Sequence, residues 1–135
     1  MRFKMLDVPE QYKIGLEELL IVRGHSLLGR DEECQADEEI IGFNMKETKE
    51  AIIRGSFIGE TETGAQRVAG LEGMEKVFLF RAFMRLVREL EKRGASESFQ
   101  WEEKILLQRN GVMMDCSRNS VLTVDTIKKY IRMQA

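Results

Sequence analysis

The sequence has very few of the residues that build disulfide frameworks or metal centres, with two cysteines and one histidine among 135 residues. Cys34 and Cys116 are too few for a disulfide framework, so we expect a reducing, cytoplasmic environment. Neither these cysteines nor His25 has a further Cys or His at metal-ligand spacing. We therefore expect no metal ion and no other cofactor, and we interpret His25 as a surface loop residue.

An excess of charge of one sign and a long apolar run are also missing. The 21 basic and 23 acidic residues leave a net charge of −2, so we expect neither nucleic acid nor membrane as partner. No uncharged apolar segment approaches the roughly 20 residues that span a bilayer. Asp7 and Pro9 interrupt the N-terminal residues before a signal peptide could form its apolar core. The length fits one domain with a core of its own.

Patterns of apolar residues predict the first elements. Phe3 and Met5 alternate with charged neighbours, as in a short strand. Residues 9–23 have the early proline, the apolar face and the following Gly24 of a helix. The polar residues 25–39 carry six acidic side chains without helical periodicity, which predicts a solvated loop.

Two short apolar runs then predict a hairpin. Residues 41–45 alternate between apolar and other side chains, and the run 51–53 returns after Glu47 and Thr48, so we expect two antiparallel strands. Five glycines between positions 55 and 73 predict an irregular segment after them.

The segment 74–93 has the clearest helical pattern, and Gly94 follows it as a natural stop. A basic stripe on this helix could contact phosphates and consists of Arg81, Arg85, Arg88 and Lys92. Acidic residues share the helix and no aromatic side chains interleave with the stripe, so we favour a solvated or domain-facing surface. Residues 99–107 alternate in part and predict another strand.

The last part of the chain combines an apolar run, a polar turn and a new helix. Residues 112–114 are apolar, and Asp115 and Arg118 follow them. Thr123 can cap the next helix, and Asp125 suits its first turn because the helix dipole favours an anion there. A strand followed by a helix is the unit of parallel α/β proteins, and no second parallel strand follows. We therefore expect the sequence to be incomplete at its C-terminus.

This terminal segment resembles the first barrel strand and first barrel helix of glycoside hydrolase family 20, the β-N-acetylhexosaminidases. The family pattern is a glycine, apolar residues, an aspartate and, three positions later, an arginine, which Gly111, Asp115 and Arg118 match. The resemblance continues through residues 124–128. The family also places a small α+β domain before its (β/α)8 barrel, and residues 1–95 fit that outline.

The resemblance implies a role for each matched residue. Arg118 would bind substrate through the 3- and 4-hydroxyls of a terminal N-acetylhexosamine, and Asp115 would support the site. Residues 1–95 would form the N-terminal non-catalytic domain, 96–110 a linking strand, and 111–135 the start of the barrel. The fold class we expect is α+β, with a small, mostly antiparallel sheet covered by helices, followed by the first β-α unit of an incomplete (β/α)8 barrel.

The catalytic groups of that family have no counterpart in this sequence. Its members hydrolyse with retention, using the acetamido oxygen of the substrate as nucleophile and an adjacent Asp-Glu pair on a later barrel strand. The acidic pairs at residues 31–32 and 37–38 precede the motif in a polar loop. We therefore assign no catalytic residue and expect this chain alone to be inactive.

A different class of function stays open beside the glycosidase. The chain could be a stand-alone protein-interaction module that binds through the Arg81 face or through the apolar run 112–114. An isolated barrel strand and its helix would also present apolar surface to a second copy, so the fragment could dimerise.

Overall fold

The computed structural model describes residues 1–29, 39–59, 67–107 and 122–134. These residues form six strands, one short 3-10 helix and three α-helices. In chain order they are β1 (Arg2–Asp7), η1 (Glu10–Tyr12), α1 (Lys13–Val22), β2 (Ser26–Leu28), β3 (Ile40–Glu47), β4 (Ile52–Ile58), β5 (Arg67–Gly73), α2 (Lys76–Arg93), β6 (Phe99–Lys104) and α3 (Val124–Gln134).

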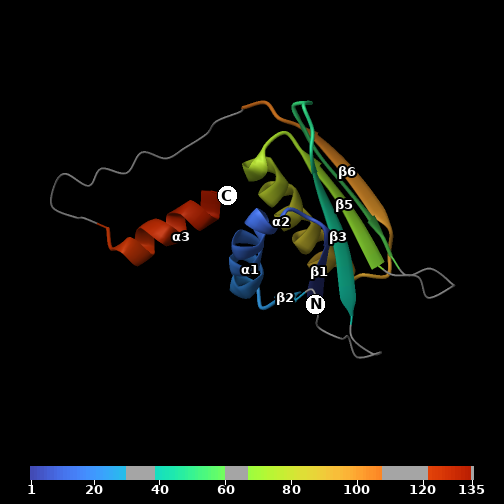
Figure 1. The fold of residues 1–135 in the computed structure, drawn as a ribbon, viewed down its shortest axis with the longest axis horizontal. Coiled ribbons are helices and arrows are strands. Elements are labelled where there is room, and N and C mark those ends of the chain that lie inside the picture. Colours follow the sequence, from blue (N-terminus) through green and yellow to red (C-terminus); the bar gives the residue numbers. More distant parts are fainter. Residues whose placement is uncertain (30–38, 60–66, 108–121, 135) are drawn as a thin grey trace.

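All six strands belong to one sheet in the order β2-β1-β3-β5-β4-β6 (Figure 1). The pairs β1–β2, β1–β3 and β3–β5 are parallel, whereas β4 is antiparallel to both of its neighbours. Five strands therefore run in one direction and β4 runs against them. The expectation of a mostly antiparallel sheet is wrong, because three of the five strand pairs are parallel: α1 returns the chain from β1 to a parallel β2, and β4 returns it from β3 to a parallel β5.

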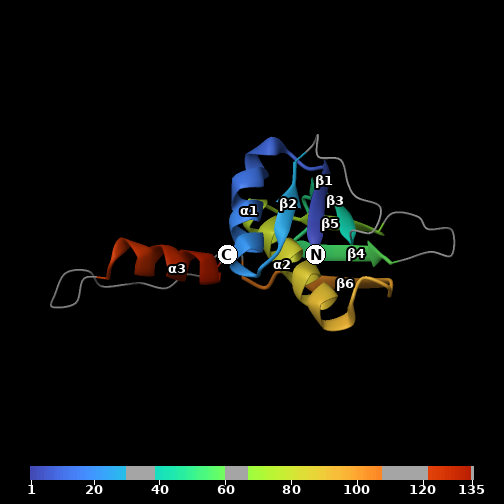
Figure 2. The same cartoon turned by 90° about the horizontal axis from the view of Figure 1, so that it is seen from below.

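Helices α1 and α2 lie on one face of the sheet and enclose the core with it (Figures 1 and 2). The aromatic centre of this core consists of Phe3 on β1, Phe43 on β3 and Phe83 on α2, all fully buried. The Phe43 and Phe83 rings lie 4.8 Å apart between centroids, and Phe3 approaches Phe83 edge-on at 5.6 Å. Offset and edge-on geometries suit aromatic pairs and add to the stabilisation from burial.

Several predicted elements are confirmed. The strand around Phe3, the first helix and the strand that begins at Phe99 are present, with η1 forming the first turn of the predicted first helix. Helix α2 covers almost the whole predicted segment 74–93, and Gly94 ends it with a positive φ of 82°. The last helix begins directly after Thr123, as the sequence indicates.

The predicted hairpin is wrong in its pairing. Both strands exist, as β3 and β4, but β5 lies between them, parallel to β3 and antiparallel to β4. The glycine-rich segment that we expected to be irregular supplies the second half of β4 and all of β5 within its described residues. The expected loop 25–39 also contains a short strand, β2, which pairs with β1.

Strand β6 is an edge strand of this same sheet, paired with β4 from Phe99 to Lys104. Part of the segment that we expected to link two domains is therefore built into the sheet. The expected barrel strand at 112–114 lies outside the described residues.

Candidate functional site

The two residues that the sequence nominates for a sugar site, Asp115 and Arg118, lie outside the described residues. The helix that follows them is described. Its N-terminus is capped as predicted, because Thr123 Oγ1 accepts a hydrogen bond from the Thr126 N–H at 3.3 Å. Asp125 lies in the first turn, where the helix dipole favours its charge. The predicted last helix is thus present, and the strand expected before it lies outside the described residues.

Helix α3 reaches back toward the helical layer. Arg132 donates from Nε and one Nη atom to Glu18 Oε2 on α1, at 3.3 Å in each case. A hollow of about 910 Å³ lies between α1, α2 and α3. Its charged lining consists of six cations and two anions: Arg23, Arg81, Arg85, Arg88, Lys129, Arg132, Glu89 and Glu103.

The basic stripe on α2 is partly neutralised by β6. Arg81 and Arg85 both form ion pairs with Glu103, and the Arg85 guanidinium lies 5.6 Å from the centre of the Trp101 ring. These two arginines hold the edge strand against the helix. Two of the four residues of the stripe are thus engaged by β6, and the Arg81 side chain is still 61% exposed, as expected for a partly solvated surface.

A second polar cluster joins the end of α1 to α2. Glu91 accepts hydrogen bonds from the Arg23 guanidinium, and His25 Nε2 lies 2.9 Å from Glu91 Oε1. The hydrogen bonds from Arg23, more than that from His25, lower the pKa of Glu91 to about 2. The His25 ring also meets Phe3 edge-on at 6.0 Å, and its side chain is only 12% exposed. His25 lies in a loop as expected, but its side chain is mostly buried, so the expectation of a surface position is wrong.

A third polar contact lies where β3 ends. The Tyr12 hydroxyl donates to Glu47 Oε1 at 2.5 Å, and Lys76 Nζ lies 5.8 Å from the centre of the Tyr12 ring. Burial, with the hydrogen bond to Glu47, raises the pKa of Tyr12 to about 12. The phenol therefore stays protonated at neutral pH and acts as a hydrogen-bond donor that holds η1 to the sheet.

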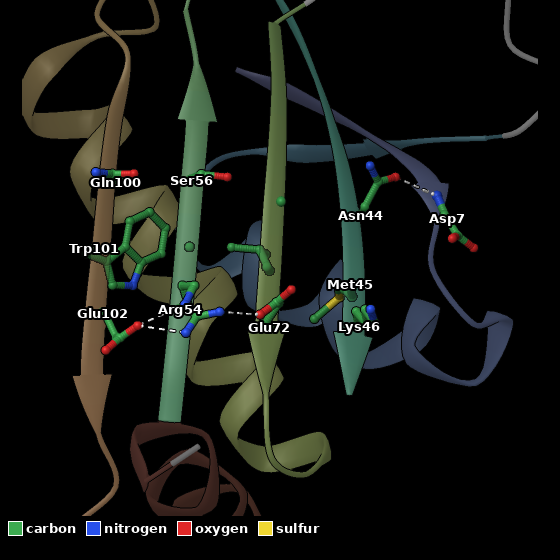
Figure 3. Close-up of a pocket in the computed structure, with 13 residues that line it drawn as sticks. Asp7, Asn44, Met45, Lys46, Arg54, Ser56, Glu72, Gln100, Trp101 and Glu102 are labelled. Carbon is green, nitrogen blue, oxygen red and sulfur yellow. Dashed lines mark hydrogen bonds and ion pairs between the residues drawn. The ribbon is translucent and has the colours of Figure 1, made fainter. Parts of the chain in front are cut away.

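The other face of the sheet carries a shallow hollow of about 810 Å³, and Figure 3 shows the side chains that line it. Charged side chains form one row across four strands: Lys46, Glu72, Arg54 and Glu102. Arg54 donates from Nε to Glu102 at 2.9 Å and from Nη1 to Glu72 at 3.1 Å. These bonds, above all the one to Glu102, raise the pKa of Arg54.

A second row of the same face is uncharged and consists of Asn44, Gly70, Ser56 and Gln100. Asn44 Oδ1 accepts a hydrogen bond from the Asp7 backbone N–H at 3.0 Å, at the register shift between β1 and β3. This bond orients the Asn44 side chain beside the hollow (Figure 3). The sequence did not predict either row. The alternation within each strand indicates which single residues point outward, but not which residues of different strands lie side by side.

Within the described part of the chain, no group of three or more His, Cys, Asp or Glu side chains is placed to hold a metal ion. None of the helices in that part combines the length and the apolar character needed to cross a membrane. Comparison with models of known families, with curated proteins and with solved structures finds no match.

Proposed function

We propose that this chain is the N-terminal region of a glycoside hydrolase that resembles the β-N-acetylhexosaminidases of family 20. The observation that carries the proposal is the motif of Gly111, Asp115 and Arg118 in the sequence, which is followed by a helix from Val124. In the whole enzyme this motif would end the first strand of a (β/α)8 barrel. Ligands bind at that end of barrel strands.

The arrangement of helices and sheet in the described residues supports this proposal. An α+β unit with helices on one side of its sheet agrees with the domain that precedes the barrel in this family. Its helical layer leaves apolar side chains uncovered, since Ile14 and Ile21 on α1 are 74% and 70% exposed and Ile131 on α3 is 60% exposed. Exposed apolar patches mark surfaces that contact another part of a protein. The remaining barrel elements would cover them.

The proposed chemistry assigns binding to this region and catalysis to a later one. Arg118 would hold the 3- and 4-hydroxyls of a terminal N-acetylhexosamine through charge-assisted hydrogen bonds, which are stronger than neutral ones. Asp115 would orient the arginine. The acetamido oxygen of the substrate would attack its own anomeric carbon, while an Asp-Glu pair on a later strand orients the acetamido group and protonates the leaving oxygen.

The gene itself tests this assignment first. We expect the reading frame to continue beyond the codon for Ala135 into further strand-helix units with an adjacent Asp-Glu pair. A stop codon directly after Ala135 would contradict the proposal and would favour a protein-interaction module.

A further inference from the structure

The sheet face that α1 and α2 leave uncovered has a charge pattern with a specific symmetry. Across β3, β5, β4 and β6, the in-register side chains Lys46, Glu72, Arg54 and Glu102 have the signs plus, minus, plus and minus. Reversing the order of such a row converts each sign into its opposite. Two copies of the row placed face to face, with the strand order reversed in one of them, therefore pair every charge with an opposite charge.

The operation that reverses the strand order is a two-fold rotation about an axis parallel to the strands, between β5 and β4. This rotation keeps each row at its own height along the strands. It places Lys46 opposite Glu102 of the second copy, and Arg54 opposite Glu72 of the second copy. A two-fold interface uses the same patch on both chains, so each pairing occurs twice.

The neighbouring rows follow the same symmetry. In the uncharged row, Ser56 would face Gly70 of the second copy, which has no side chain to oppose it. The amides of Asn44 and Gln100 would face each other across the interface. In the next row, Ile58 is paired in register with Val68 and is 55% exposed. Ile58 would therefore face Val68 of the second copy, and Val68 would face its Ile58.

We propose that this open face of the sheet binds a second copy of the chain to form a two-fold dimer. Packed sheets lie about 10 Å apart, a distance that a lysine or arginine and a glutamate can bridge from opposite sides. The charged row contains two cations and two anions, so it does not attract a polyanion or an anionic membrane. Charge complementarity selects the second copy.

The size of the face predicts a weak dimer. Four strands at about 4.8 Å spacing and seven residues of strand length give a footprint of roughly 450 Å² per copy before side chains are counted. Stable interfaces bury about 800 Å² per partner. The dimer should therefore form only at high protein concentration, and it should weaken as salt screens the exposed charges.

A charge-exchange experiment with the 135-residue chain tests the dimer. Sedimentation equilibrium from about 10 μM to about 1 mM should show the wild-type mass rising toward that of two chains. Lys46→Glu and Glu102→Lys should each raise the dissociation constant by at least about tenfold, because each places like charges together at two symmetric positions. An equimolar mixture of these two variants should dimerise as the wild type does, since the new glutamate of one chain then meets the new lysine of the other.

The mixture also controls for folding, because misfolded chains could not recover dimerisation. Lys128→Glu makes the same charge change on exposed α3 and should dimerise normally. Three outcomes overturn the proposal: a wild type that stays monomeric, single variants that dimerise with the wild-type dissociation constant, or a mixture that dimerises no better than the single variants. None of these outcomes bears on the proposed glycosidase function, because the experiment does not involve Arg118.

Discussion

Gly55 on β4 and Trp101 on β6 are cross-strand partners, and the indole ring fills the space that a side chain at position 55 would need. Glycine weakens a strand on its own, since it loses the most backbone freedom on folding and contributes no packing. Because Gly55 has no side chain, the ring of Trp101, the only tryptophan in the sequence, can lie over it, and Trp101 is only 9% exposed. The edge strand is thus held to the core by one large ring.

We expect Gly55→Ala to destabilise the fold by about 1–3 kcal/mol, because the new methyl group displaces the buried ring. Gly70→Ala is the matched control: its methyl group would meet only the Ser56 hydroxyl, at 3.3 Å. Urea unfolding of both variants measures the difference. Equal stabilities of the two variants would contradict the tight approach of Trp101 to Gly55.

Glu91 makes a pH-dependent contribution to stability. Its pKa is lowered to about 2 by Arg23 and His25, so the ionised form stabilises the fold above the ordinary pKa of a glutamate. That contribution is lost as the pH falls from about 4.5 toward 2. Glu91→Gln should cost about 1–2 kcal/mol at pH 7 and almost nothing well below pH 2, where both side chains are neutral. Urea unfolding at several pH values would refute this if the difference stayed constant.

At the scale of elements, the helices could be predicted from the sequence because their signals are local. The apolar spacing in α2, its Gly94 stop and the Thr123 cap of α3 each involve residues within a few positions. Strand β5 gave no such signal. Gly73 on this strand points toward α2, and a Cβ atom at this position would lie only 3.0 Å from the α2 backbone. This glycine therefore allows close packing of the helix on the strand and does not mark a loop.

The pairing of strands could not be predicted in the same way. Strands β3 and β4 are close in sequence and both alternate, which favours a hairpin. The structure instead inserts β5 between them. Alternation fixes the face on which a residue lies but not the strand beside it, so the sequence pattern could not exclude this arrangement.

The cap of α3 gives a prediction for one element. Thr123→Ala removes the hydroxyl that accepts from the Thr126 N–H and should cost the helix about 1 kcal/mol. Thr123→Ser keeps the hydroxyl and should behave as the wild type. Hydrogen exchange of the α3 amides measures the effect. Equal protection in the alanine and serine variants would mean that the side chain of residue 123 does not cap the helix.

At the scale of the whole molecule, the two candidate sites differ in how the sequence reveals them. Asp115 and Arg118 are close together in the chain, so a motif could nominate them. The charged row on the open face combines residues from four strands between positions 46 and 102, and its alternation exists only in the strand order β3-β5-β4-β6. No sequence pattern contains that order.

The whole molecule also presents two surfaces of different character. The helical side exposes apolar residues of α1 and α3 beside a basic hollow, and the sheet side exposes the polar and charged rows. In the proposed enzyme the first surface would meet the barrel, and the second would remain available to a second copy.

The most direct measurement is hydrolysis of 4-nitrophenyl N-acetyl-β-glucosaminide by the protein encoded by the full reading frame, with and without Arg118→Ala. We predict that the wild type cleaves this substrate and that the variant loses about 10- to 100-fold in kcat/KM while remaining folded, since a charged hydrogen-bonding group to the sugar is lost. Arg118→Lys should recover only part of the activity, because lysine lacks the planar fork. An inactive wild type, or a variant that cleaves as fast as the wild type, would contradict the proposed function.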